Sequence, residues 1–67
     1  MKPESRLEIA RRRVVEAEML VERQARLVSD LQQKCRPVQH AISLLALLHA
    51  SLQAFRDALA VVEREGR

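Results

Sequence analysis

The side chains best suited to chemistry in this sequence are one cysteine and two histidines. Cys35 is the single cysteine, and His40 and His49 follow it along the chain. On one helix these two histidines, nine residues apart, would point about 180° away from each other. Cys35 and His40 could meet at a turn, but two ligands are fewer than the three or four of a usual zinc site. We therefore expect no metal site and no cofactor.

Cys35 also suggests a redox or cross-linking role, because its neighbours Lys34 and Arg36 are basic and basic surroundings favour thiol reactivity. A lone cysteine at a helix end more often serves as a small apolar residue, which is the simpler interpretation. A free thiol fits a reducing compartment. The N-terminal stretch lacks the apolar segment of a signal peptide, so we expect a cytoplasmic location.

The remaining polar residues give little indication of catalysis or of nucleic-acid binding. The serines have no base at a suggestive spacing, and we expect no enzyme. Arg11, Arg12 and Arg13 would point about 100° apart on a helix and cannot form one basic stripe. The net charge is only +3, and stacking aromatic residues are missing from the sequence around them. A weak nucleic-acid-binding or regulatory accessory role for this Arg-rich half remains the alternative function.

These residues must be positioned by helices. The chain has 67 residues, one glycine, two prolines and one aromatic residue, and it is rich in good helix formers. A chain of this length usually needs disulfides, a metal or oligomerisation to be stable. One cysteine excludes an internal disulfide, so oligomerisation is the expected source of stability.

Residues 38–62 carry the strongest pattern in the sequence. Apolar residues recur there at alternating spacings of three and four, which predicts a helix with a continuous heptad seam. A second stripe with the same rhythm runs beside the seam, so this helix has more apolar surface than one partner helix can cover. The run from Pro37 to Phe55 has no charged residue, yet its glutamines, histidines and serines make it too polar for an expected membrane span.

The first half predicts a one-sided amphipathic helix at about residues 4–34. Ser5 and Glu8 have the spacing of a capping box, although Pro3 could instead occupy the first turn. Glu8–Arg12 and Glu22–Arg26 have the favourable order for ion pairs along a helix. Gln24 falls at a seam position, either as a partly exposed residue or as a polar group that fixes the register.

Pro37 is the internal helix breaker, and it suits the first turn of a following helix. We therefore predict a turn at 35–37, a second helix at about 37–64, and an antiparallel hairpin, since the connection is short. A glycine is expected at the C-terminal cap of the first helix but is missing. Folding the chain at residues 35–36 would place Phe55 beside Val14 and Ala17.

Several segments resemble a set of small uncharacterised bacterial proteins made of two helices. The segments are residues 10–18, 27–31, 43–48 and 52–57. The resemblance implies a helical hairpin and supplies no site residues. Such proteins often carry a glycine at the turn, where this sequence has Cys35 or Arg36.

The sequence thus predicts one all-α domain, residues 1–67, in which an antiparallel two-helix hairpin dimerises into a four-helix bundle. We expect a structural or protein-interaction module with itself as partner, or another helical protein, and we expect neither nucleic acid nor membrane. The predicted hairpin core is Leu7, Val14, Val21, Val28, Leu31, Leu45, Leu48, Leu52, Phe55, Leu59 and Val62. The predicted dimer interface is Leu44, Leu47, Ser51, Ala54, Ala58 and Val61. A competing contact would use Ile9, Val15 and Met19 of the first helix.

Overall fold

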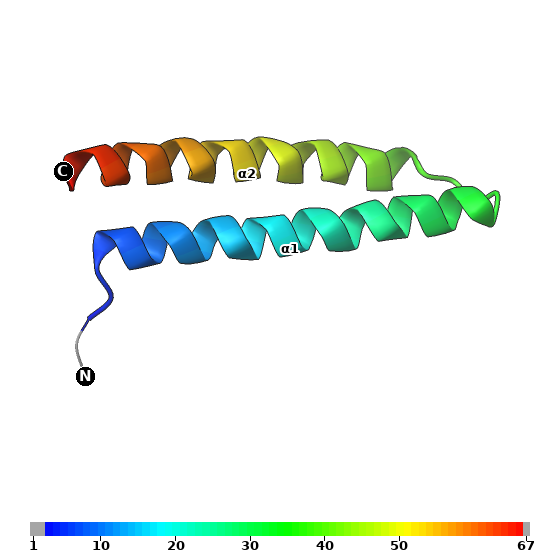
Figure 1. Ribbon diagram of the computed structural model, residues 1–67. Helices are drawn as coiled ribbons and strands as arrows, with labels where there is room; N and C mark the ends of the chain where they lie inside the picture. The colour runs from blue at the N-terminus through cyan, green and yellow to red at the C-terminus, as the bar shows by residue number, and fades with distance from the viewer. Residues whose placement is uncertain (1–2, 67) are drawn as a thin grey trace.

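The protein is a hairpin of two long helices. A computed structural model describes residues 3–66, and this part of the chain contains α1 (Arg6–Gln33), α2 (Gln39–Glu65) and no strand. The helices run antiparallel, and the turn lies at the end opposite the two termini (Figure 1). The predicted all-α hairpin is therefore confirmed.

Helix α1 begins where the capping box predicts. Ser5 is the N-cap, and its hydroxyl oxygen accepts a hydrogen bond of 3.1 Å from the backbone N–H of Glu8. The Glu8 carboxylate accepts a bond of 3.3 Å from the Ser5 hydroxyl, in place of the backbone contact of a full capping box. Pro3 precedes the helix, so its expected alternative place in the first turn is not used.

Helix α1 ends in a Schellman motif built around Cys35. The N–H of Arg36 donates to the carbonyl of Leu31 at 2.9 Å, and the N–H of Cys35 donates to that of Gln32 at 3.1 Å. This motif requires a left-handed residue, and Cys35 has a φ of 54°. The cap geometry that usually selects glycine is thus formed here by a residue with a side chain, at an energetic cost.

Helix α2 starts later than the sequence suggested. Its first residue is Gln39 and its N-cap is Val38, whose carbonyl accepts the N–H of Ile42 at 2.9 Å. Pro37 lies outside the helix, so its predicted place in the first turn is wrong. Neighbouring helix axes are about 8–10 Å apart, and the chain needs non-helical residues to cross that distance. Pro37 belongs to this crossing segment, and α2 extends to Glu65, one residue beyond the predicted end.

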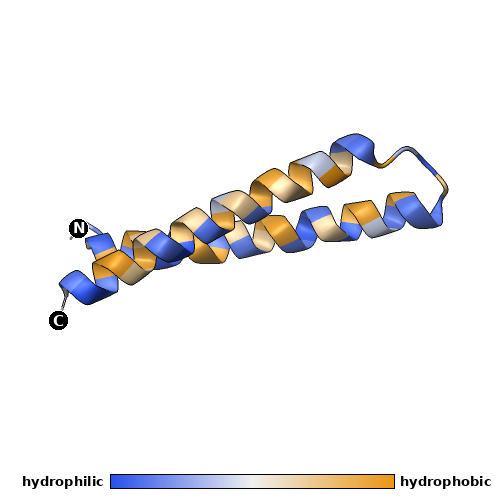
Figure 2. Cartoon of the chain, turned by 90° about the horizontal axis from the view of Figure 1, so that it is seen from above, coloured by the Kyte–Doolittle hydropathy of each residue, from blue (hydrophilic) through white to orange (hydrophobic). Residues whose placement is uncertain are grey.

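The core is a narrow seam along the facing sides of the helices. Its buried centre consists of Val14, Ala17 and Leu52, and Phe55 packs against it, the register expected from folding at residues 35–36. Apolar segments recur along the whole length of both helices (Figure 2). The molecule measures 50 × 25 × 13 Å, and its radius of gyration is 15.5 Å, whereas about 11 Å is typical of a compact chain of this length. One layer of helices therefore leaves most side chains at the surface.

Shortening a buried side chain of the seam should destabilise the hairpin. We expect Leu52→Ala to lower the free energy of unfolding by about 2–5 kcal/mol, the range for a buried leucine, because Leu52 is only 6% exposed. Arg12→Ala is the control and should change it by less than about 1 kcal/mol, since its ion pairs are solvent-exposed. Urea unfolding at equal protein concentrations measures both, and equal losses would contradict the seam.

Relieving the left-handed cysteine should stabilise the hairpin. We expect Cys35→Gly to raise the free energy of unfolding by about 1 kcal/mol, because glycine adopts positive φ without steric cost. Cys35→Ala is the matched control: it also removes the thiol but keeps the Cβ atom, and should leave stability nearly unchanged. A gain as large in the alanine variant would assign the effect to the thiol and contradict the backbone explanation.

Candidate functional site

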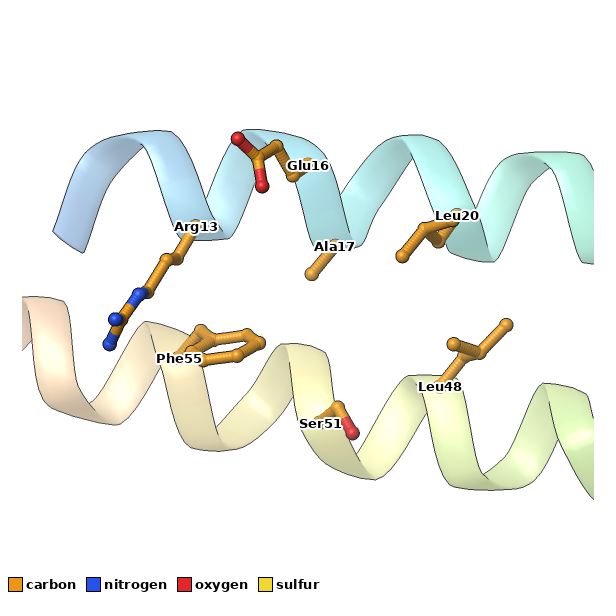
Figure 3. Close-up of a pocket in the computed structure, with 7 residues that line it drawn as sticks. All are labelled: Arg13, Glu16, Ala17, Leu20, Leu48, Ser51 and Phe55. Atoms are coloured by element: carbon orange, nitrogen blue, oxygen red, sulfur yellow. The ribbon is translucent and has the colours of Figure 1, made fainter. Parts of the chain in front are cut away.

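An apolar hollow lies on one side of the seam, between the two helices (Figure 3). It is a shallow groove of about 370 Å³. Ala17 and Leu20 point into it from α1, opposite Leu48 and Phe55 of α2, with Ser51 between them (Figure 3). Arg13 and Glu16 complete the lining. The groove could take apolar side chains of another helix, and its floor of alanine and serine permits close approach.

The opposite side of the seam is polar. A smaller hollow of about 240 Å³ is lined there by Glu18, Glu22, His49 and Arg56, together with the edges of core residues. Glu18 and His49 each stand two residues from groove residues, Leu20 and Ser51, and two residues are about 200° of helix rotation. Arg56 contacts Glu18 at 3.5 Å. A mostly apolar groove therefore borders the seam on one side, and a mostly charged hollow borders it on the other.

The predicted hairpin core residues all lie along the seam. Val14, Val28 and Leu52 are buried, and the other residues of that set are half-buried. Ala17 and Gln24 are also buried, although they are outside the predicted set. Both belong to the column of α1 next to Val14 and Val21, and the sequence already indicated a seam position for Gln24.

The predicted interface residues are not covered by any part of residues 3–66. All six are exposed, and Leu47 is the most exposed large apolar residue of the described chain at 65%. On α1, Leu20 and Leu27 are 46% and 45% exposed, and Leu20 lines the groove on the same side. The uncovered apolar surface therefore extends over both helices.

The competing contact on α1 is less continuous. Val15 and Met19 are exposed, but Ile9 is half-buried. Met19 borders a small hollow shared with Glu22, Arg23 and Arg26. Charged neighbours around Met19 make this face less suited to burial against another chain.

The side chains that could react or bind a metal do not cluster in the structure. Cys35 is exposed at the turn, and His40 and His49 are exposed on α2. Within residues 3–66 no three groups come together in a way that could hold a metal ion. Ser5 serves as the helix cap. These side chains therefore give no catalytic arrangement from which a reaction could be derived.

Three of the six arginines of α1 are paired with carboxylates in the described part of the chain. Arg12 contacts Glu4 and also Glu16, the latter at 3.4 Å. The predicted Glu8–Arg12 pair is wrong, because the Glu8 carboxylate is bound to the Ser5 hydroxyl. The predicted Glu22–Arg26 pair is confirmed at 3.9 Å. Such pairs reduce the positive field that phosphates would meet along this helix.

Gln24 is the one polar residue buried in the seam of the described chain. It is 9% exposed, and its side-chain N–H donates to the carbonyl oxygen of Ala41 at 2.9 Å. This bond crosses from α1 to the first turn of α2. The interpretation as a register-fixing group therefore fits the structure, and the partly exposed alternative does not.

Helix α2 also meets the length and composition of a membrane span. The mean hydropathy of its best window is 1.3, and 6% of that window is buried within the chain. The core helix of a soluble protein passes the same test, although such a helix is mostly buried. The finding shows how much apolar surface α2 leaves uncovered.

Comparison with known proteins gives no match: neither a protein-family model, nor a curated protein, nor a solved structure is similar to this chain. The resemblance to small bacterial two-helix proteins stays a prediction.

The bond from Gln24 should make this position intolerant of charge. We expect Gln24→Glu to lower the free energy of unfolding at neutral pH by about 1–3 kcal/mol, because a buried carboxylate would face the Ala41 carbonyl. Gln24→Met is the matched control, similar in size and uncharged. It should cost less than about 1 kcal/mol, since only one hydrogen bond is lost. Thermal unfolding compares them, and equal melting temperatures would contradict this role.

Proposed function

We propose that this protein is a small self-associating helical module whose role is structural or protein-interacting. One observation carries the proposal: the second apolar stripe of α2 is exposed along the whole helix. Soluble monomers rarely leave a continuous apolar patch of this kind uncovered. A second copy of the chain would cover it and would turn two hairpins into a four-helix bundle.

The surface area supports the same proposal. The chain exposes 5572 Å², whereas a compact protein of its mass, 7.7 kDa, exposes about 4300 Å². A standard interface removes about 800 Å² from each partner. Burial of that size would bring the exposed surface per chain close to the value of a compact protein.

A membrane is the rival cover for α2, and the distribution of polar residues weighs against it. His49, Gln53 and Arg56 lie on one side of α2 and would face lipid if the helix crossed a bilayer. A charged residue near the centre of a span costs about 2.5–3.5 kcal/mol even on the most lenient scale. In an assembly of hairpins the same residues face water.

The proposal predicts a dimer that forms through the second apolar stripe of α2. Light scattering should give twice the chain mass of 7.7 kDa. The double variant Ala54→Glu, Ala58→Glu should shift the mass to that of one chain or unfold the protein, because each carboxylate would be buried without a partner. Ala60→Glu makes the same change on the opposite side of α2 and should leave the dimer intact.

Met19→Glu tests the competing face on α1 and should also be tolerated. A stable dimer of the double variant, or dissociation caused by Met19→Glu, would show that another surface holds the assembly.

A further inference from the structure

The exposed stripe of α2 is longer than the six residues of the predicted interface. It continues at the same alternating spacing into one polar residue at each end, and we call the whole set the association stripe. Its residues are His40, Leu44, Leu47, Ser51, Ala54, Ala58, Val61 and Glu65, all of them exposed. A stripe with this rhythm is a coiled-coil seam that still needs a partner helix.

We infer that the association stripe binds the same stripe of a second copy in antiparallel orientation, with the two-fold axis passing between Ser51 and Ala54. The inference rests on the proposed self-association and specifies its geometry. A two-fold axis brings the same patch from both copies together, so the patch must complement itself. The side-chain sizes and charges along the association stripe are self-complementary when the two copies run antiparallel.

Size complementarity favours the antiparallel direction. The stated axis places Ser51 opposite Ala54 of the second copy and Leu47 opposite Ala58, so that the most exposed leucine meets a small side chain. Leu44 then meets Val61 at the outer layers. A parallel pair would set Leu47 against Leu47 and Ala58 against Ala58. That arrangement crowds one half of the interface and leaves gaps in the other, and both defects destabilise packing.

The charges at the stripe ends favour the same direction. The antiparallel pair places His40 opposite Glu65 of the second copy, twice by symmetry. A histidine ring can donate a hydrogen bond to a carboxylate. The parallel pair would bring the two Glu65 carboxylates together, which is unfavourable. Glu65 also contacts Arg6 at 3.1 Å, so a basic group of α1 lies at the same end of the hairpin.

The groove side of α1 adds to the contact. Leu20 and Leu27 are exposed beside the association stripe, on the side of the groove formed with Leu48 and Phe55. When α2 packs on α2 of the second copy, the two grooves face each other. Helix α1 then stands at the flank, where Arg13 and Glu16 can remain in contact with water.

Spin-label distances between copies test the orientation. Cys35→Ala removes the native thiol, and a single cysteine is then placed by Gln53→Cys or by Glu63→Cys, both on exposed positions. At a rise of 1.5 Å per residue, the labels of two antiparallel copies are about 1.5 Å apart along the axis at residue 53 and about 32 Å apart at residue 63. The measured distance at residue 63 should therefore greatly exceed that at residue 53.

A mixed sample provides the matched control. Copies labelled through Ile42→Cys and copies labelled through Glu63→Cys should show a shorter distance between them than either variant shows alone, because these two positions lie at the same level along the antiparallel pair. Each of the two variants alone should show only the long distance.

The outcomes separate the two proposals when light scattering is run on the same samples. A dimer with similar distances at residues 53 and 63 is parallel; it overturns this inference and leaves self-association standing. A monomeric mass overturns both. A monomer that floats with phosphatidylcholine vesicles also overturns both and identifies lipid as the cover of α2.

Discussion

The limit that shapes this protein is geometric: two helices touch along one line and cannot enclose a core. The seam between α1 and α2 buries a few side chains, such as Val14, Ala17 and Leu52, and leaves a layer only 13 Å thick. Hydrophobic burial is the main favourable term in folding, and a short chain obtains little of it alone. The uncovered apolar stripe of α2 follows from this shortage.

The sequence predicted those parts of the fold that depend on periodicity or on local hydrogen bonds. The seam positions and the Ser5 cap follow from residue spacing within one helix, so they were accessible. Where the chain leaves α1 and enters α2 depends on the path between the helices, which no local pattern encodes. Cys35 therefore adopts the left-handed conformation without the usual glycine, and Pro37 stays outside the helix. The sequence has no glycine at this position, and the C-terminal cap of α1 forms without one.

The polar contacts also separate into those within one helix and those between the two helices. Pairs within a helix compete with one another, and the bond between Ser5 and Glu8 left Arg12 to other carboxylates. The pairs Arg6–Glu65 and Glu18–Arg56 join the two helices and could be found only once the register was known. Exposed pairs of this kind contribute little. Gln24 differs because it is buried, and a slip of the helices would leave its amide without a partner.

Helix α2 shows why hydropathy alone does not identify the environment of a helix. Averaged along the chain, it resembles a membrane span. Resolved around the axis, it divides into three stripes: the seam, the association stripe, and a polar stripe that includes His49, Gln53 and Arg56. Lipid would surround every side that α1 leaves open, whereas the proposed second hairpin would cover only one side. The proposed bundle of hairpins would require this division, with one open apolar side to bury and one open polar side to leave in water.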